Sequence, residues 1–305
     1  MVKKPAKKAP KPEPKAELIT DEAHAGAATE GFFARLVNQF SVAWLFLTRI
    51  PLPGWWNKPV VDEPESETDL ADKGLGMTPL ADTVRAWPVV GIAIGALSGG
   101  TLWLAANAGL HPLAASFLGL AVAALATGAL HEDGLADLLD GFGGGDTKAK
   151  KLRIMRDSNI GTFGVMGLVV VVGFKAGTLA SFTSPAFAAA ALLTAHVLSR
   201  AMLPMLMVTL PPARRSGLGK TAGVPTKENA VMTAGIGVLV AVLAIGPGPG
   251  LVASVLAGLS VAAVGWLAGR HIQGFTGDVL GAAQQISEAV VLAGVAVMLR
   301  TLFYA

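Results

Sequence analysis

The fold class of this chain is decided by residues 161–182, which read GTFGVMGLVVVVGFKAGTLASF. This stretch has 22 residues and a single charged side chain, Lys175. A helix needs about 20 mainly apolar residues to cross the hydrocarbon core of a bilayer. Six other stretches meet the same test, so the sequence predicts an all-α, polytopic membrane bundle of about seven transmembrane helices. The predicted spans are 86–107, 113–131, 161–182, 186–209, 231–247, 250–270 and 281–303.

The composition of the whole chain also indicates a membrane protein. Of its 305 residues, 52% are hydrophobic and 15% are charged, whereas soluble domains carry about 25% charged residues. Mean hydropathy is +0.57. The chain has no cysteine, which excludes disulfides and thiolate metal sites. The net charge of +3 comes mostly from one tail. We therefore expect membrane lipid, and no nucleic acid, as a partner.

The N-terminal part of the chain differs from the spans. Residues 1–30 alternate Lys with Pro and Ala, which predicts a disordered basic tail. Residues 31–305 are predicted to form a single membrane-embedded domain. Within it, residues 32–53 are apolar only in part and end in a proline-containing segment, which favours an interfacial or re-entrant helix. The acidic stretch 57–74 has no apolar periodicity and is predicted to be a loop.

The distribution of Lys and Arg predicts the orientation. Seven spans place the tail and the loops 132–160, 210–230 and 271–280 on one side, and this side holds nearly every Lys and Arg. The short loops of the opposite side contain none. The positive-inside rule then puts the charged side in the cytoplasm, which predicts a multi-pass protein of the cytoplasmic (inner) membrane.

The first polar cluster on that side is HEDGLADLLDG, residues 131–141. Asp133, Asp137 and Asp140 follow an i, i+4, i+7 spacing and fall within about 60° of arc on a helix. Three carboxylates on one stripe repel each other unless a cation lies among them, and Mg²⁺ prefers oxygen ligands. The alternative is a solvated loop start with incidental Asp residues. His131 is either a helix-end hydrogen-bonding residue or a general base beside the metal.

A second cluster, residues 154–164, precedes the span 161–182. Arg156 is a candidate phosphate ligand, and Asp157 is a candidate metal ligand. Ser158 or Thr162 is expected to cap the following helix, whose N-terminus favours anions. An ordinary capped helix start is the alternative interpretation.

A third cluster, residues 274–288, leads into the last span. Asp278 begins this helix, where a carboxylate is favourable as a cap. Glu288 lies inside the apolar span, and a carboxylate there indicates a functional site by default. Lys175 and Arg200 also lie inside spans. They are expected either to snorkel or pair with Glu288, or to guide an anionic substrate.

Together these clusters closely resemble the cobalamin synthase family, the adenosylcobinamide-GDP ribazoletransferases. The resemblance covers about residues 35–300. One departure is Glu132, which stands where an apolar residue is expected, so we do not expect Glu132 to be catalytic. The tail and the acidic insert near 62–72 lie outside the resemblance. The motifs that carry it are HEDGLADLLDGFGGG, IMRDSNIGTFG, the step Ser199-Arg200-Ala201, TGDVLGAAQQISE, FLTRIPLP, RAWPVVG and GLGK.

The resemblance implies a magnesium-dependent transferase of cobalamin biosynthesis. It would join adenosylcobinamide-GDP to alpha-ribazole or alpha-ribazole 5′-phosphate, giving adenosylcobalamin or its 5′-phosphate and GMP. The implied catalytic residues are His131, Asp133, Asp137 and Asp140. The implied Mg²⁺ ligands are Asp133, Asp137, Asp140 and Asp157, with Asp278 completing the set or holding a second ion. The implied substrate-binding residues are Arg156, Ser158, Arg200, Lys220, Asp278 and Glu288.

Other function classes were weighed against this one. Another Mg²⁺-dependent membrane phosphotransferase, of the CDP-alcohol type, has a related DG-x-x-A pattern but carries Arg where this chain has Asp137. Aromatic prenyltransferases carry two aspartate motifs, whereas the second and third clusters here hold single Asp residues. A transporter is expected to show inverted repeats, and the sequence has none that we detect. The lower base, the number of metal ions and the general base stay open, and a homo-oligomer is compatible with the sequence.

Overall fold

The structure is a computed structural model that describes residues 32–53, 79–214 and 222–304. The predicted tail 1–30, the acidic stretch 57–74 and Lys220 lie outside these residues. The chain divides into two units, Met1–Leu36 and Val37–Ala305, and almost everything described belongs to the second. The described residues form helices and no β-strand. The helices are α2 (Phe32–Leu47), η1 (Leu80–Ala86), α4 (Trp87–Asn107), α5 (Pro112–Thr127), α6 (Leu130–Gly144), α7 (Lys148–Ile154), α8 (Thr162–Ala180), α9 (Pro185–Thr209), α11 (Lys227–Ile245), α12 (Pro247–Ile272) and α13 (Gly277–Tyr304).

The all-α polytopic fold is confirmed. Six helical segments are long and apolar enough to cross a membrane, and the bent pair α5–α6 supplies up to one more. Six of the seven predicted spans each coincide with one such helix, and the bounds differ by a few residues at most. The predicted span 113–131 corresponds to α5, which passes the same test only together with α6. The largest shift of a C-terminal bound is at α5. This helix ends at Thr127, whereas the sequence predicted an end at residue 131. The protein is therefore a multi-pass helical membrane protein.

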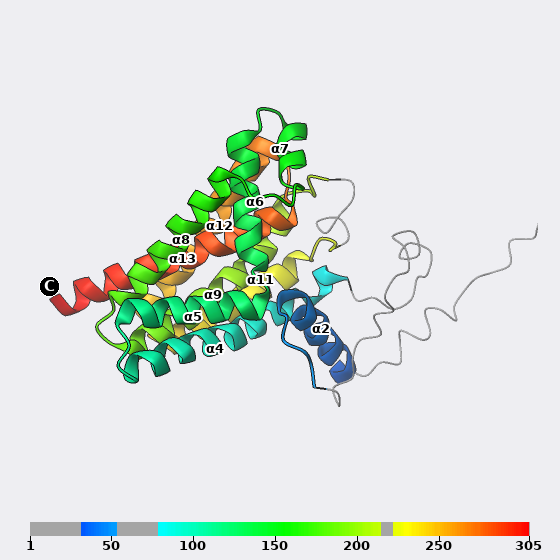
Figure 1. The fold of residues 1–305 in the computed structure, drawn as a ribbon. Coiled ribbons are helices and arrows are strands. Elements are labelled where there is room, and N and C mark those ends of the chain that lie inside the picture. Colours follow the sequence, from blue (N-terminus) through cyan, green and yellow to red (C-terminus); the bar gives the residue numbers. More distant parts are fainter. Residues whose placement is uncertain (1–31, 54–78, 215–221, 305) are drawn as a thin grey trace, which may run out of the picture. The chain divides into compact units, whose positions relative to one another are not determined.

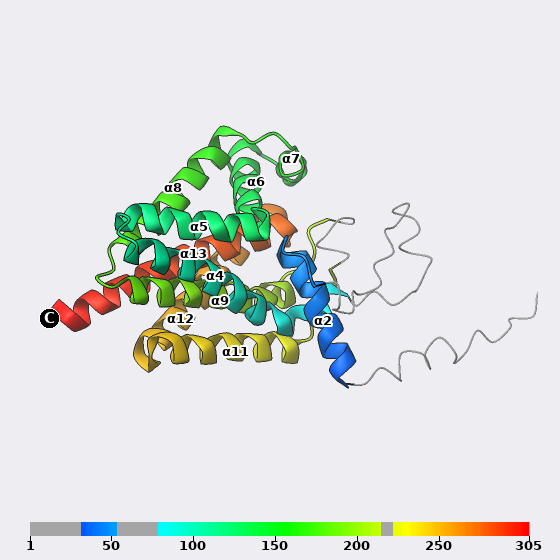
Figure 2. The same ribbon diagram turned by 60° about the horizontal axis from the view of Figure 1, so that its bottom comes forward.

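Helix α9 forms the centre of the bundle. In its most apolar stretch 83% of the residues are buried, against 22% for α11. Figures 1 and 2 show α4 running beside α9 along much of its length. A Cβ added at Gly91, Gly95 or Gly99 of α4 would lie 2.7–2.9 Å from α9 backbone atoms. These glycines therefore allow a close helix contact, whereas Gly100 faces open space.

Helix α2 ends at Leu47, and residues 48–53 continue without helix. The described part of α2 has 16 residues, and it is not among the described segments that are long and apolar enough to cross a membrane. Its interfacial or re-entrant placement stays a prediction.

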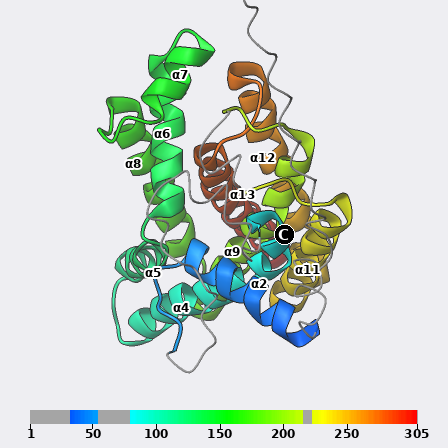
Figure 3. The same ribbon diagram turned by 90° about the vertical axis from the view of Figure 1, so that its right-hand side faces the viewer.

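The chain turns sharply between α5 and α6. Gly128 and Ala129 both adopt left-handed backbone angles, with φ of 64° and 56°. This turn bends α6 by 91° from α5. Figure 3 shows α6 and α7 rising on one side of the bundle, α12 on the other, and α13 between them. The turn thus places the acidic helix α6 beside the start of α13, at the end of the bundle where the charged loops lie.

Candidate active site

The aspartate stripe predicted from the sequence lies on a helix, α6. Its three carboxylates differ in environment: Asp133 is exposed, Asp137 is partly buried and Asp140 is buried. Residues spaced i, i+4 and i+7 share one face of a helix. Asp140 lies against the start of α8, so the three similar positions face different neighbours.

Helix α6 meets the start of α13 through two glycines. A Cβ on Gly134 would lie 3.0 Å from the Asp278 carbonyl oxygen, and one on Gly281 would lie 3.1 Å from the His131 carbonyl oxygen. This close approach brings Asp278 within electrostatic range of the stripe, so Asp137 experiences the negative charges of Asp133 and Asp278. The two helices therefore form an acidic cluster that a single helix does not supply.

A guanidinium group faces this acidic cluster. The loop after α9 is fixed beside residue 275, because Ala213 N–H donates to the Phe275 carbonyl at 2.8 Å and Phe275 N–H donates to the Pro211 carbonyl at 2.9 Å. Arg214 follows directly, and its Nη2 donates to Asp278 Oδ2 at 3.3 Å and to the Leu152 carbonyl at 3.2 Å.

Arg214 is half-buried and is not fully paired. Its Nε lies in the interior without a hydrogen-bond partner among the described residues. Burial lowers the pKa of the Arg214 guanidinium, and the positive charge of Arg156 lowers it further. Arg156 therefore lies within electrostatic range of Arg214, and Arg214 lies beside the Asp278 carboxylate.

Asp140 has a different environment from the rest of the stripe. Its Oδ2 accepts a hydrogen bond from Gly161 N–H at 2.7 Å, and its Oδ1 accepts one from Gly164 N–H at 2.9 Å. These amides are at the N-terminus of α8, where backbone N–H groups have no partner within the helix. Asp140 thus caps α8 from another helix.

The expected cap from Ser158 or Thr162 is not found. Gly161 is the N-cap residue of α8 and makes no side-chain cap. The prediction was wrong because Asp140, distant in sequence, already occupies the first amides of the helix. Ser158 is exposed on the preceding loop.

A second polar group lies within the bundle and centres on Glu288 of α13. Its carboxylate pairs with Lys175 of α8 at 3.0 Å and with Arg200 of α9 at 3.4 Å. It also contacts His196, one turn before Arg200. All four side chains are 3% exposed or less. The interpretation in which Lys175 and Arg200 pair with Glu288 is therefore confirmed.

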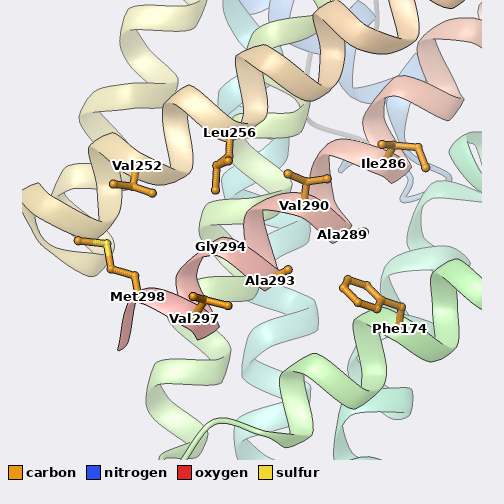
Figure 4. Close-up of a pocket in the computed structure, with 10 residues that line it drawn as sticks. All are labelled: Phe174, Val252, Leu256, Ile286, Ala289, Val290, Ala293, Gly294, Val297 and Met298. Carbon is orange, nitrogen blue, oxygen red and sulfur yellow. The ribbon is translucent and has the colours of Figure 1, made fainter. Parts of the chain in front are cut away.

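An apolar cavity lies on another face of α13, between α12 and α8 (Figure 4). It measures about 710 Å³ and is lined entirely by apolar residues, among them Phe174, Leu256 and Val290. It offers no acidic, basic or nucleophilic side chain. This cavity is therefore not a candidate site for acid–base or phosphoryl-transfer chemistry.

Comparison with known proteins identifies the family. Residues 39–296 match the profile of the cobalamin-5-phosphate synthase family. The chain belongs to this family. A relative from Bradyrhizobium diazoefficiens is 44% identical over 70% of this chain and 82% of its own length. A relative from Azorhizobium caulinodans is 41% identical over 88% of this chain and 98% of its own length. A relative from Mesorhizobium japonicum is 38% identical over 85% of this chain and 92% of its own length. All three are named adenosylcobinamide-GDP ribazoletransferase. No solved structure matches the chain.

In this cobalamin-5-phosphate synthase family member, the expected site residues divide into groups. Asp133, Asp137 and Asp278 come together with Arg214 at the polar end. Arg156 lies within electrostatic range of Arg214. Arg200 and Glu288 lie in the inner network instead. Asp157 is exposed and accepts hydrogen bonds from Asn159, whose backbone amide is the main cause that lowers the pKa of this carboxyl.

His131 lies on the inner side of α6 in this family member. Its side chain is 4% exposed. Its ring experiences the charges of Arg200 and Glu288. His131 therefore faces the inner network more than the exposed end of the stripe.

Sequence reasoning missed several residues of both groups. Arg214 was counted only as one of many loop cations, although a pair of Arg residues directly after a span is a usable signal. His196 precedes Arg200 by four residues and so shares its face of α9, a spacing that was available in the sequence. Thr276, which donates to Asp278 Oδ2 at 3.1 Å, carried no distinctive signal.

The donor set of the acidic cluster fits magnesium in chemistry. The cluster is rich in carboxylate oxygens that repel each other, as Asp137 and its acidic neighbours do. Among the described residues, however, no three acidic or histidine side chains are arranged to hold a metal ion by themselves. Mg²⁺ commonly takes one or two carboxylates and completes its shell with water and substrate phosphates. Asp133 and Asp137 fit this pattern, whereas both oxygens of Asp140 are engaged by backbone amides.

Proposed function

We propose that this protein is an adenosylcobinamide-GDP ribazoletransferase that acts at the cytoplasmic face of the cell membrane. It would join adenosylcobinamide-GDP to alpha-ribazole or alpha-ribazole 5′-phosphate and release GMP. Family membership and the names of the relatives support the activity. The observation that carries the site is the meeting of acidic side chains from α6 and α13 with Arg214 at one end of the bundle.

The proposed reaction exchanges one bond at phosphorus. A ribose hydroxyl oxygen attacks the phosphorus that bears the cobinamide, and the phosphoanhydride bond to GMP breaks. GMP leaves with the bonding electrons, and the hydroxyl proton passes to a base. The diphosphate repels an incoming oxygen and the leaving group gains negative charge, so the site must supply positive charge.

Arg214 and Arg156 are suited to supply that charge. Arg214 lies beside Asp278, and its Nε has no hydrogen-bond partner among the described residues. Guanidinium groups bind phosphates through several N–H donors in a fixed geometry. We infer that Arg214 is the principal phosphate ligand and that Arg156, which is exposed, assists it. Lys220, outside the described residues, stays a candidate.

The proton acceptor is proposed to be Asp133 or Asp137. Both carboxylates are accessible at the end of the bundle, whereas the ring of His131 is buried. A general base must come within hydrogen-bond reach of the hydroxyl. Mg²⁺, when bound by these carboxylates, would neutralise diphosphate charge and stabilise the leaving GMP.

The cytoplasmic placement of this site is supported by charge. The loops at the acidic end carry Lys148, Lys150, Arg153 and Arg214, and the short loops at the other end carry no Lys or Arg. This asymmetry agrees with the positive-inside rule for a bacterial-type cytoplasmic membrane protein.

GMP release from the full chain in lipid vesicles tests the proposal. We expect release that requires both adenosylcobinamide-GDP and alpha-ribazole, and that stops with EDTA. Asp137→Asn should abolish it, whereas the matched control Asp146→Asn should not, because Asp146 is an exposed partner of Lys150. Turnover of CDP-diacylglycerol or a polyprenyl diphosphate in place of adenosylcobinamide-GDP would overturn the assignment.

A further inference from the structure

We propose that Glu132 is a positioning residue, which balances the charge of the inner network and fixes the rotation of α6 so that its aspartates face Asp278 and Arg214. This inference rests on the proposed function. It concerns a residue at which the family resemblance gave no reason to expect a role.

The charges of the inner network require a second anion. Lys175 and Arg200 are two buried cations, and Glu288 supplies one negative charge to both. An unbalanced charge in a buried site is strongly unfavourable. Glu132 lies close enough for Arg200 to experience its negative charge. With a neutral His196, the formal charges of Glu132 and Glu288 cancel those of Lys175 and Arg200.

A chain of hydrogen bonds connects Glu132 to this network. Gln285 Nε2 donates to Glu132 Oε1 at 2.9 Å. Lys175 Nζ donates to Gln285 Oε1 at 2.6 Å and to Glu288 Oε2 at 3.0 Å. Gln285 of α13 therefore links the acidic helix α6 to α8. The second carboxylate oxygen of Glu132 is also buried and has no hydrogen-bond partner in the described part of the chain. The buried Glu132 carboxylate therefore depends on this network for its stabilisation.

The position of Glu132 on α6 explains why this residue would control the orientation of the aspartates. Gly134 and Gly281 bring α6 and α13 into backbone contact. A contact between glycines makes no directional side-chain bond, so it restrains the rotation of α6 only through steric fit. The bond from Gln285 to Glu132 is directional, and it lies beside this contact. Because Asp133 follows Glu132 directly, rotation of α6 would move Asp133 and Asp137 away from Asp278.

Paired substitutions test the charge balance in the full chain, in vesicles. Glu132→Gln keeps a hydrogen-bond acceptor but removes the charge, and Lys175→Met removes the opposing charge. We expect each single variant to lower GMP release by about tenfold or more, since small displacements at a reacting centre have large effects. The double variant should recover to within about threefold of wild type, because coupled sites are not additive. Glu228→Gln, an exposed glutamate at the start of α11, is the matched control.

Two readouts separate positioning from loss of folded protein. A smaller folded fraction lowers the maximal rate but leaves the Mg²⁺ concentration for half-maximal rate unchanged, whereas a rotated α6 raises that concentration. Because the chain has no cysteine, spin labels at Ala149→Cys of α7 and Leu259→Cys of α12 can report the position of the α6–α7 segment without activity. We expect Glu132→Ala to broaden or shift the distance distribution between these labels.

The outcomes are decisive for the inference. It is overturned if the double variant equals the worse single variant both in rate and in the yield of monodisperse protein, or if Glu132→Ala leaves the label distances unchanged. The inference is supported if Glu132→Gln gives a poor yield of monodisperse protein and the addition of Lys175→Met restores that yield. If wild-type vesicles release no GMP, the proposed function fails, while the yield and label measurements still decide the role of Glu132.

Discussion

Replacing Asp140 by Ala distinguishes a helix cap from a metal ligand. The structure shows both Asp140 oxygens accepting hydrogen bonds from Gly161 and Gly164 at the start of α8. The sequence placed the same residue among the Mg²⁺ ligands. We expect the variant to lose stability, and to lose it whether or not Mg²⁺ is present.

The size of the effect follows from the two bonds. A hydrogen bond to a charged acceptor contributes about 1.5–3 kcal/mol, and a buried N–H left unpaired carries its own desolvation cost. Asp140 is only 8% exposed, so water cannot fully replace the carboxylate. Allowing for overlap between the two bonds, Asp140→Ala should cost about 3–5 kcal/mol. Asp140→Asn keeps one acceptor and should lose about half as much.

Thermal unfolding of the purified protein, in detergent with EDTA, measures this loss. A change of 1 kcal/mol moves Tm by about 2–4 °C in domains of 150–250 residues, so Asp140→Ala should lower Tm by about 10 °C. Asp146→Asn, which removes an exposed carboxylate at the same end, provides the control and should leave Tm unchanged.

The opposite pattern would refute this reasoning. If Asp140 acts through Mg²⁺, its variants should have the Tm of wild type in EDTA and a much higher Mg²⁺ requirement for GMP release. If it caps α8, folded Asp140→Asn protein should keep the wild-type Mg²⁺ requirement.

Three further predictions follow from the same contacts. In α8, Gly164→Ala should lower Tm because its Cβ would collide with the Asp140 carboxylate, whereas Gly173→Ala, which faces open space, should not; thermal unfolding of the two variants tests this. Asp137→Asn should lower GMP release by more than about 100-fold with unchanged Tm, if the carboxylate acts in the reaction; a rate near wild type would exclude that role. Arg214→Gln should raise KM for adenosylcobinamide-GDP, and Arg214→Lys should recover only part of the affinity because Lys lacks the planar set of donors; steady-state kinetics would contradict this if both variants match wild type.

The helices were predictable because membrane spans depend on length and apolar composition, both of which are local. Residues 161–182 needed no neighbour to be identified, and α8 occupies Thr162–Ala180. The pairing of Glu288 with Lys175 and Arg200 was also predictable as one of two interpretations, since ionisable groups within spans seek partners. The identity of the partner followed from the small number of buried charges.

The roles within the aspartate stripe were not predictable from spacing. Asp133, Asp137 and Asp140 have equivalent positions in the helical repeat, and only packing makes them differ. The partners of Asp140 are backbone amides more than twenty positions along the chain, and amides leave no signal in side-chain composition. Arg214 was missed for a related reason, because its position depends on the pairing of its loop with Phe275.

These contacts imply that α6 is held near both of its ends by helices of the membrane bundle. Near its start, Glu132 is bonded to Gln285 of α13, and near its end Asp140 is bonded to the first amides of α8. Asp133 and Asp137 lie between these two attachments. Their positions relative to Asp278 therefore depend on how α8 and α13 pack within the bilayer. A substitution deep in the bundle, such as one at Lys175, should consequently alter chemistry at the polar end without touching a substrate.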